Sequence, residues 1–314
     1  ACGMGALQAN TTGTDNTAVG RGALETNTTS GYNTAVGDRA LTVNTAELNT
    51  AVGSLSAYSN TTGSQNTALG QAALYTNTTG SNNTAVGRYS LRLNTTANDN
   101  TAVGKEALHK NTTGGSNTAV GNEALESNTT GANNTAVGAL ALDANTTATG
   151  STAVGYASLT DNTGAYNTGL GSYSLFQHTT GGNNVALGGF TLYNNTTASN
   201  NTAVGYGSLL ANTTGTNNIA VGAFALDANT TGSQNIAIGL NALGATTTGI
   251  DNVAVGHASQ TSGTTQSKCT SVGYDSLLSN TTGTRCTAVG FMALRASTGV
   301  NNTAIGCNAG DNIT

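Results

Sequence analysis

The side chains that most often carry out catalysis are few in this chain and lie far apart. Its three histidines, His109, His178 and His257, are separated by 69 and 79 residues. Because the chain repeats about every 17 residues, these separations span at least four coils, or about 19 Å at a strand spacing of about 4.8 Å. A metal site or an acid–base pair needs its members within a few ångströms of one another. We therefore expect neither a histidine-based metal centre nor a catalytic dyad.

The carboxylates do not indicate acid–base chemistry either. Glu25, Glu106, Glu123, Glu126 and Asp143 occupy variable positions of the repeat, where solvated surface side chains are expected. No Gly-Gly-x-Gly-x-Asp calcium nonapeptide occurs, and the recurring glycines lack the Lys-Ser/Thr of a phosphate-binding loop. The sequence predicts that the protein is not an enzyme and binds no cofactor or metal ion.

A unit of 16 or 17 residues repeats along the whole chain. Counted from its first asparagine, it reads Asn-Thr-Ala-Val-Gly, two variable residues, a small residue, Leu, two variable residues, Asn-Thr-Thr-Gly and two variable residues. Its first five positions appear at Asn16–Gly20 and recur up to Asn302–Gly306. So short a unit cannot bury its own apolar face and must stack on its neighbours.

Composition narrows the range of partners. Only 7% of the 314 residues are charged, against roughly 25% in typical soluble domains. The net charge of −5 is spread thinly, without a basic run, which argues against binding to nucleic acids or anionic membranes. No apolar stretch approaches the roughly 20 residues of a membrane span.

The Thr-Ala-Val motif alternates β-branched and small residues, as a strand of period 2 does. Position four is Val, Leu or Ile in every full copy, and position two, usually Thr, becomes aliphatic at Val185, Ile219, Ile236 and Val253. We interpret both positions as facing inward. A second inward row is expected from the leucine at position nine, as at Leu24, Leu41, Leu74 and Leu108.

This pattern predicts an all-β fold: a parallel β-solenoid, or β-roll, of about 18 coils of 16–17 residues. Residues 1–314 are expected to form one continuous repeat array, a segment of a longer fibre protein. The asparagine at position one predicts an amide ladder along the stack, because Asn can hydrogen-bond both its neighbours in the stack and the local backbone.

If Thr and Val face inward, the alanine between them faces outward. An uncharged stripe of small residues would let the backbone of another chain approach closely, and we expect three parallel chains to meet there. The candidate residues of this chain-packing face are Ala18, Ala35, Ala85, Ala119 and Ala203.

Aromatic residues cluster just after the glycine that ends the strand motif. They are candidate surface contacts for a sugar or a neighbouring chain, but they could equally cover a turn. A contiguous patch would favour a contact site. These residues are Tyr89, Tyr156, Tyr173, Phe190, Tyr206, Phe224, Tyr274 and Phe291.

Two cysteines, Cys269 and Cys286, replace the first asparagine in successive coils. In-register stacking would place their Cα atoms about 4.8 Å apart, within the roughly 4.4 to 6.8 Å that a disulfide tolerates. They are a candidate disulfide, and the alternative is a pair of free thiols that act as small hydrophobic residues. The preceding coil departs most from the repeat, since Gln260 replaces the core leucine and Gly263 the second asparagine. We expect that coil to be the weakest.

The motifs at Asn16–Gly20 (Asn-Thr-Ala-Val-Gly) and Asn235–Gly239 (Asn-Ile-Ala-Ile-Gly) resemble the Ser-Val-Ala-Ile-Gly coils in the heads of trimeric autotransporter adhesins. The fuller unit, with Ala-Leu and Asn-Thr-Thr-Gly, is similar to repeats of phage tail fibres. The resemblance covers the whole chain and implies a left-handed parallel β-roll with three chains packed side by side. The period here is longer than that of the adhesin coil.

Three functions are compatible with these features. The leading hypothesis is an extracellular structural and adhesive fibre, as in a virion tail fibre or a cell-surface adhesin. Its partners would be copies of itself, as a homotrimer or filament, and a glycan or protein receptor on a host surface. The second hypothesis is a secreted filament without a specific receptor. The third, an ice-binding solenoid, is disfavoured because adjacent Thr-Thr residues face opposite sides and no Thr-x-Thr array is present.

Overall fold

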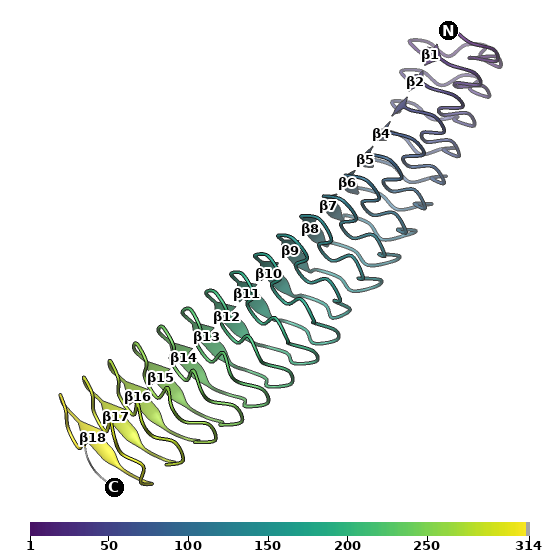
Figure 1. Cartoon of the computed structure of the whole chain (residues 1–314). Coiled ribbons are helices and arrows are strands. Elements are labelled where there is room, and N and C mark those ends of the chain that lie inside the picture. Colours follow the sequence, from purple (N-terminus) through teal and green to yellow (C-terminus); the bar gives the residue numbers. More distant parts are fainter. Residues whose placement is uncertain (312–314) are drawn as a thin grey trace. The chain divides into compact units, whose positions relative to one another are not determined.

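The computed structural model describes residues 1–311, which fold into stacked coils that each contain one short strand (Figure 1). The regular elements of this part of the chain are 18 three-residue strands. Successive strands begin 16 or 17 residues apart, so the predicted parallel β-solenoid and its coil lengths are confirmed. Residues 1–311 contain no helix that could cross a membrane.

The coils group into two compact units, Ala1–Ala157 and Ser158–Thr314. The strands of the first unit are β1 (Thr17–Val19), β2 (Thr34–Val36), β3 (Thr50–Val52), β4 (Thr67–Leu69), β5 (Thr84–Val86), β6 (Thr101–Val103), β7 (Thr118–Val120), β8 (Thr135–Val137) and β9 (Thr152–Val154). The strands of the second unit are β10 (Thr168–Leu170), β11 (Val185–Leu187), β12 (Thr202–Val204), β13 (Ile219–Val221), β14 (Ile236–Ile238), β15 (Val253–Val255), β16 (Thr270–Val272), β17 (Thr287–Val289) and β18 (Thr303–Ile305).

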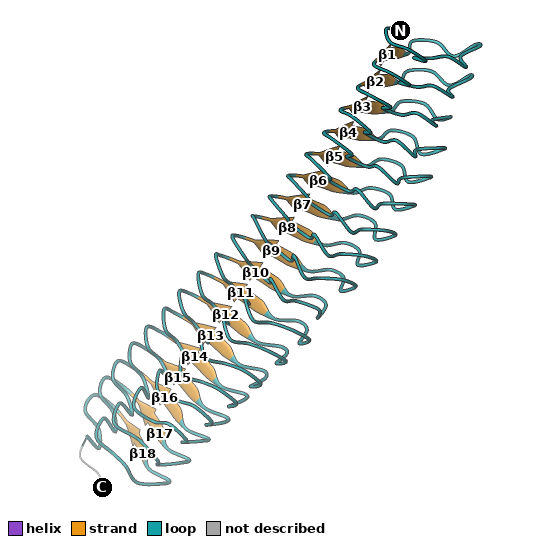
Figure 2. Cartoon of the chain, turned by 45° about the vertical axis from the view of Figure 1, so that its right-hand side comes forward, coloured by secondary structure: helices purple, strands orange, loops and turns teal. Residues whose placement is uncertain are grey.

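Within each unit, every strand pairs in parallel with the next, and identical positions of the repeat lie side by side. In the first unit, Thr17–Val19 pairs with Thr34–Val36 residue for residue. In the second unit, Thr168–Leu170 pairs in the same register with Val185–Leu187. Figure 2 shows the strands of each unit aligned along one side of the coils, with turns forming the remainder.

The strands bury the opposite face from the one that the sequence analysis predicts. The middle residue is buried in β1 to β17, whereas the Thr and Val on either side of it are half-buried or exposed. The predicted inward rows at positions two and four are therefore wrong, while the leucine row at position nine is buried as predicted. The proposed chain-packing alanines are at most 1% exposed and line the chain's own interior, which excludes them as a contact surface: Ala18, Ala35, Ala85, Ala119 and Ala203.

The interior is too narrow for a larger side chain at position three. Gly169 stands at this position in β10, and a Cβ added there would lie 2.6 and 2.8 Å from the hydroxyl oxygens of Ser158 and Ser174. Ser271 fits because its hydroxyl lies 2.6 Å from that of Ser259, within hydrogen-bonding distance. Since protein interiors are close-packed, the small residue takes the inner side and the β-branched residues remain on the outer side.

Two columns of buried asparagine run beside the Ala and Leu rows. At position twelve, Asn77 Nδ2 donates to Oδ1 of Asn60 in the preceding coil (2.7 Å) and to the carbonyl of Gly80 (2.8 Å). At position one, Oδ1 of Asn83 accepts a hydrogen bond from the backbone N–H of Asn100 (3.0 Å). The predicted amide ladder is confirmed, and a second one accompanies it. Because a buried polar group left without a partner costs about 1–3 kcal/mol, the ladders hold each coil in register with its neighbours.

The turn after the strand has a backbone conformation that is rare for residues with side chains. At position five, Gly104 has φ +141°, and a Cβ there would overlap the carbonyl oxygen of Gly121 in the next coil. Positions seven and nine are also left-handed, as at Glu106 (φ 59°) and Leu108 (φ 50°). Each such residue costs about 1–2 kcal/mol. Hydrogen bonds between coils offset this cost, as where the Leu108 N–H donates to the carbonyl of Ala124 (3.0 Å).

The irregular coil replaces the missing asparagine with a side chain from another position. Gly263 leaves a space at position twelve. The side chain of Gln266, which stands at the position of the usual glycine, fills this space, and a Cβ at Gly263 would overlap its amide. Gln266 Nε2 donates to Oγ1 of Thr246 in the preceding coil (2.9 Å). The buried Gln260 also has a partner, since its Nε2 donates to Oδ1 of Asn252 (3.3 Å). Gln266 therefore keeps the contact with the preceding coil, whereas its Oε1 is buried without a hydrogen-bond partner, so the column of polar contacts does not extend from Gln266 to the next coil.

The orientation of the strands predicts opposite tolerance at two neighbouring residues of β8. Ala136→Leu should lower the free energy of unfolding by about 1–3 kcal/mol, because it overfills the interior. Val137 is 36% exposed, so Val137→Thr, which leaves no overfilled interior, should lower that free energy by less than Ala136→Leu does. Denaturant titration followed by circular dichroism measures both variants. A larger loss for Val137→Thr than for Ala136→Leu would contradict the orientation.

Gly263 and Gln266 stand where most coils have Asn and Gly, respectively. This predicts that substitutions at the two positions have strongly coupled effects on the free energy of unfolding. Gly263→Asn alone and Gln266→Gly alone should each destabilise the chain, the first by steric overlap and the second by removing the hydrogen bond that Thr246 Oγ1 accepts from Gln266. The double variant restores the usual pair and should be more stable than the sum of the single effects by about 0.5–3 kcal/mol. Additive effects in a double-mutant cycle would show that Gln266 does not substitute for the asparagine.

Candidate functional site

The side chains at positions two and four form an outer surface, which we call the strand face. Position four carries Val, Leu or Ile in all 18 described strands, and position two carries Thr, Val or Ile. No charged residue of these strands lies on this face. The most exposed position-four residues are between 36% and 73% accessible: Val19, Val52, Val137, Val154, Leu170, Ile238, Val272 and Ile305. Within each unit, such a row of aliphatic side chains is typical of an interaction surface.

The variable positions six, seven and ten follow the strand and form a second surface, which we call the turn edge. In the first unit it carries several charged side chains, and some of them pair from coil to coil. Arg21 Nε lies 2.7 Å from Asp38 Oδ1, and the hydrogen bond from Arg21 lowers the pKa of Asp38. Lys105 Nζ lies 3.4 Å from Glu123 Oε1. These exposed pairs add little stability and mark a solvated surface.

Three tyrosines and two arginines form a mixed cluster on this part of the turn edge. Tyr58 and Tyr75 stack with ring centroids 5.4 Å apart. The guanidinium of Arg92 lies 5.7 Å from the ring centroid of Tyr75 and 5.2 Å from that of Tyr89. Arg88 lies 4.4 Å from the Tyr89 centroid, and its hydrogen bond to the hydroxyl lowers the pKa of Tyr89. Cations therefore occupy ring faces at Tyr89, one of the predicted contact residues.

The turn edge of the second unit is aromatic instead. Six rings, which we call the aromatic edge, contact one another in a continuous series. Ring centroids are 5.3 Å apart for Tyr173–Phe190, 5.8 Å for Phe190–Tyr206 and 5.5 Å for Tyr206–Phe224. A parallel pair, Phe176 and Tyr193, stacks at 5.2 Å and joins the first two rings. The members are Tyr173, Phe176, Phe190, Tyr193, Tyr206 and Phe224.

The structure therefore gathers four of the predicted aromatic residues, Tyr173, Phe190, Tyr206 and Phe224, into one contiguous patch. A separate column contains Tyr274, which stacks on His257 at 4.9 Å and on Phe291 at 5.5 Å. Tyr156 lies on the turn edge of the first unit and is 48% exposed. Sequence reasoning missed Phe176 and Tyr193 because they stand at position ten rather than directly after the glycine. Their spacing of one repeat was the available signal.

The two stacked cysteines do not form the candidate disulfide. Cys269 and Cys286 are buried free thiols, and each sulfur lies beside a carbonyl of its own turn, 3.4 Å from Gly283 O and 3.2 Å from Gly299 O. Parallel stacking points both side chains the same way rather than toward each other. Burial raises the pKa of Cys269 to about 11, so the thiol is unreactive near neutral pH. The alternative of two free thiols is the one that the structure shows.

The three histidines lie in three different environments. Among residues 1–311, no group of three or more His, Cys, Asp or Glu could hold a metal ion. His178 replaces the ladder asparagine at position twelve: its Nε2 lies 2.6 Å from the carbonyl of Gly181, and its Nδ1 lies 2.8 Å from Nδ2 of Asn195. Since a carbonyl only accepts and an amide NH₂ only donates, His178 must be neutral with its proton on Nε2. Burial lowers the pKa of His178.

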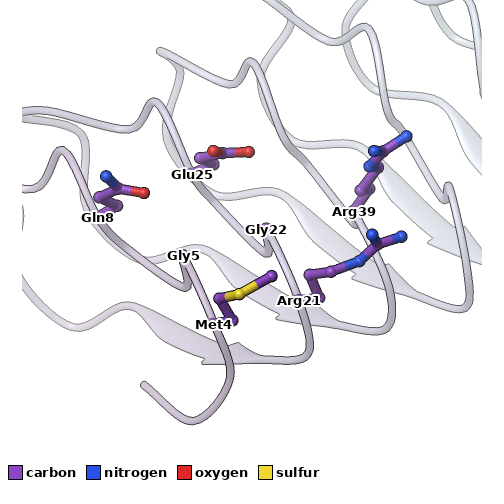
Figure 3. Close-up of a pocket in the computed structure, with 7 residues that line it drawn as sticks. All are labelled: Met4, Gly5, Gln8, Arg21, Gly22, Glu25 and Arg39. Carbon is purple, nitrogen blue, oxygen red and sulfur yellow. The ribbon is translucent and has the colours of Figure 1, made fainter.

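A hollow of about 320 Å³ opens on the turn edge of the first coils. Gly5 and Gly22 leave it empty by lacking side chains at position seven, while Glu25 and Arg39 bring opposite charges to its rim (Figure 3). Arg21, on the same rim, is already paired with Asp38. Because the rim carries both an acidic and basic side chains, the hollow does not favour a ligand of one charge.

Comparison with protein-family models finds no match to this chain, and comparison with curated proteins finds none either. The strand face and the aromatic edge are thus the features from which a function can be argued.

The neutral state of His178 predicts a loss of stability in acid. The unfolded chain binds a proton below a pH of about 6.5, whereas the folded chain resists it, so the free energy of unfolding should fall as pH drops from 7.5 to 5. The nearest Asp, Glu, Lys or Arg along the chain are Asp161 and Asp227, and both are kept in the variant that follows. His178→Asn restores the usual ladder residue and should remove about 1 kcal/mol or more of the acid-dependent loss.

Denaturant midpoints at pH 7.5 and 5 measure this effect, with His257→Asn as the matched control because the His257 side chain is 44% exposed. An equal acid-dependent loss in the wild type and in His178→Asn would contradict the assigned tautomer.

Proposed function

We propose that this chain is a shaft or head segment of an extracellular structural fibre, in which parallel copies associate through the strand face. The observation that carries the proposal is the strand face itself. Every strand presents an aliphatic residue to the outside, and none presents a charge. Scattered apolar residues are ordinary on protein surfaces, but a continuous row supports an interface.

A second copy of the chain suits this face in its chemistry and its periodicity. The rows repeat once per coil, so parallel copies placed side by side meet with like positions at every coil. Without Asp, Glu, Lys or Arg on the face, association removes no charge from water, which would be costly. The nine strands of one unit give a face about 40 Å long at about 4.8 Å per strand.

Three copies are the number that we propose. The repeat resembles the coils of trimeric adhesin heads and of tail fibres, and three chains can each turn one face toward a common axis. The Val and Thr rows would then form the contact between chains that the sequence analysis predicts for the alanine row. Such a fibre would belong to a virion tail or a cell surface and would act by binding, without catalysis. Its turn edge would remain free for a glycan or protein receptor.

Two alternatives use the same face differently. A secreted filament without a receptor would also self-associate there, but its turn edge would bind nothing. Ice binding has one observation in its favour: in all nine strands of the first unit, position two is a threonine on the outer side, where the sequence had predicted an inward row. An ice-binding face must be open to water, whereas a fibre buries it.

The mass of the protein in solution tests the proposal. Sedimentation equilibrium should give three times the chain mass of 30.9 kDa. The double variant Val103→Lys/Val137→Lys places charges on the strand face and should dissociate the assembly while circular dichroism stays unchanged. The matched control, Asn122→Lys/Asn133→Lys, adds the same charges at exposed turn positions and should keep the wild-type mass.

A stable wild-type monomer would overturn the fibre proposal. Thermal hysteresis of a freezing solution of that monomer would then support ice binding, and its abolition by Thr101→Lys/Thr135→Lys would locate the activity on the strand face.

A further inference from the structure

We propose that the aromatic edge binds an uncharged carbohydrate chain that lies along the stack of coils. This inference names a ligand class for the receptor contact of the proposed fibre and rests on that function only for its biological setting. Its members are exposed or half-buried, and Tyr206 is 53% exposed and Phe224 38% exposed. The contacts described above join all six rings into one surface over four successive coils.

The surroundings of the aromatic edge carry little charge. Residues 162–226 contain no Asp, Glu, Lys or Arg, and the one histidine among them, His178, is buried in the ladder. The nearest charged residues along the chain are Asp161, in the coil before Tyr173, and Asp227, at position ten of the coil that carries Phe224. Both are acidic, so an anionic ligand would lose hydration without gaining an opposite charge. In the first unit, by contrast, the turn edge carries paired Arg, Lys, Asp and Glu side chains.

The ring geometry leaves apolar surface for a ligand. The rings of Tyr173 and Phe190 are within 24° of parallel with centroids 5.3 Å apart. Contacting ring planes lie about 3.5 Å apart, so these rings must be displaced sideways by about 4 Å, and each covers only part of the other's face. Tyr206 stands at 66° to Phe190 and 78° to Phe224, which prevents it from being covered by a stacked neighbour.

Glycines in adjacent coils hold the outer rings close to the backbone. A Cβ at Gly207 would lie 3.0 Å from the ring of Phe224, and one at Gly189 would lie 3.7 Å from the ring of Tyr206. The rings therefore lie over the preceding coil. This position lets the series of rings act as one continuous platform.

Polar groups beside the platform match the other half of a sugar. The exposed side chain of Gln177 and the half-buried side chain of Asn194 stand at position eleven of the two coils that carry Phe176 and Tyr193. Amides and tyrosine hydroxyls can both donate and accept hydrogen bonds, as sugar hydroxyls require. Ligand sites commonly combine apolar rings with a few such polar groups. A six-membered sugar is about as large as a phenyl ring, so a row of rings one coil apart accommodates several successive sugars.

Affinity electrophoresis of the full chain tests this inference. Native gels would contain one of three neutral polymers, dextran, galactomannan or hydroxyethyl cellulose, or the anionic polymer alginate. We expect retardation by at least one neutral polymer and none by alginate. Phe190→Ser/Tyr206→Ser should weaken that retardation at least tenfold in apparent Kd. The control Tyr58→Ser/Tyr75→Ser removes a stacked pair from the first unit and should bind as the wild type does.

Several results would overturn the inference: no retardation by any neutral polymer, retardation by alginate alone, or equal binding by Phe190→Ser/Tyr206→Ser and the wild type. Circular dichroism and sedimentation of the same samples separate this inference from the fibre proposal. An intact trimer that binds no neutral polymer would refute the carbohydrate site alone. A monomer whose retardation depends on Phe190 and Tyr206 would refute the fibre alone.

Discussion

The stacking of buried asparagines is the constraint on which the rest of the structure depends. Most ladder amides hydrogen-bond an adjacent coil, as Asn77 does with Asn60, so the coils must keep nearly the same backbone path. Where the next coil is one residue shorter or lacks the asparagine, Oδ1 of Asn27, Asn145 and Asn229 is buried without a partner. That path is tight: residues with positive φ follow each strand, and position three, on the inner side of the strand, holds only glycine, alanine or serine. The fold is therefore held by repetition of contacts rather than by a large apolar core.

A narrow interior forces the larger aliphatic residues outward. In most soluble proteins Val is buried in preference to Thr or Ala, but here volume decides the orientation and leaves Val on the surface. The coil therefore has an apolar row that its own chain cannot cover. This follows from the same close packing that makes Gly169 and Ser271 tolerable at position three, and it supports an interface between copies of the chain.

The period, the strand position and the amide ladder could be predicted from the sequence because each is a property of spacing. Which face of the strand is buried could not be predicted, because a period of two separates the residues into two faces without showing which face lies inside. The replacement of Thr at position two by Ile219 or Ile236 is compatible with burial in the core or in an interface between chains. The better signal was position three, which never holds anything larger than Ser. The left-handed turn residues, such as Glu106 and Leu108, have no signature in residue type, since hydrogen bonds between coils stabilise them.

The candidate sites follow from the same separation of fixed and free positions. Ladder and core positions tolerate few changes, and where one is changed, as at Gly263, another residue compensates, as Gln266 does. Positions six, seven and ten belong to neither the ladders nor the Ala and Leu rows, so their residues can differ between the two units while the coils stay alike. The first unit uses them for ion pairs such as Arg21–Asp38, and the second for contacting rings such as Tyr173–Phe190. Because the coils of both units fold alike with different side chains at these positions, the fold does not require the aromatic series, and this is consistent with the carbohydrate ligand that we propose for it.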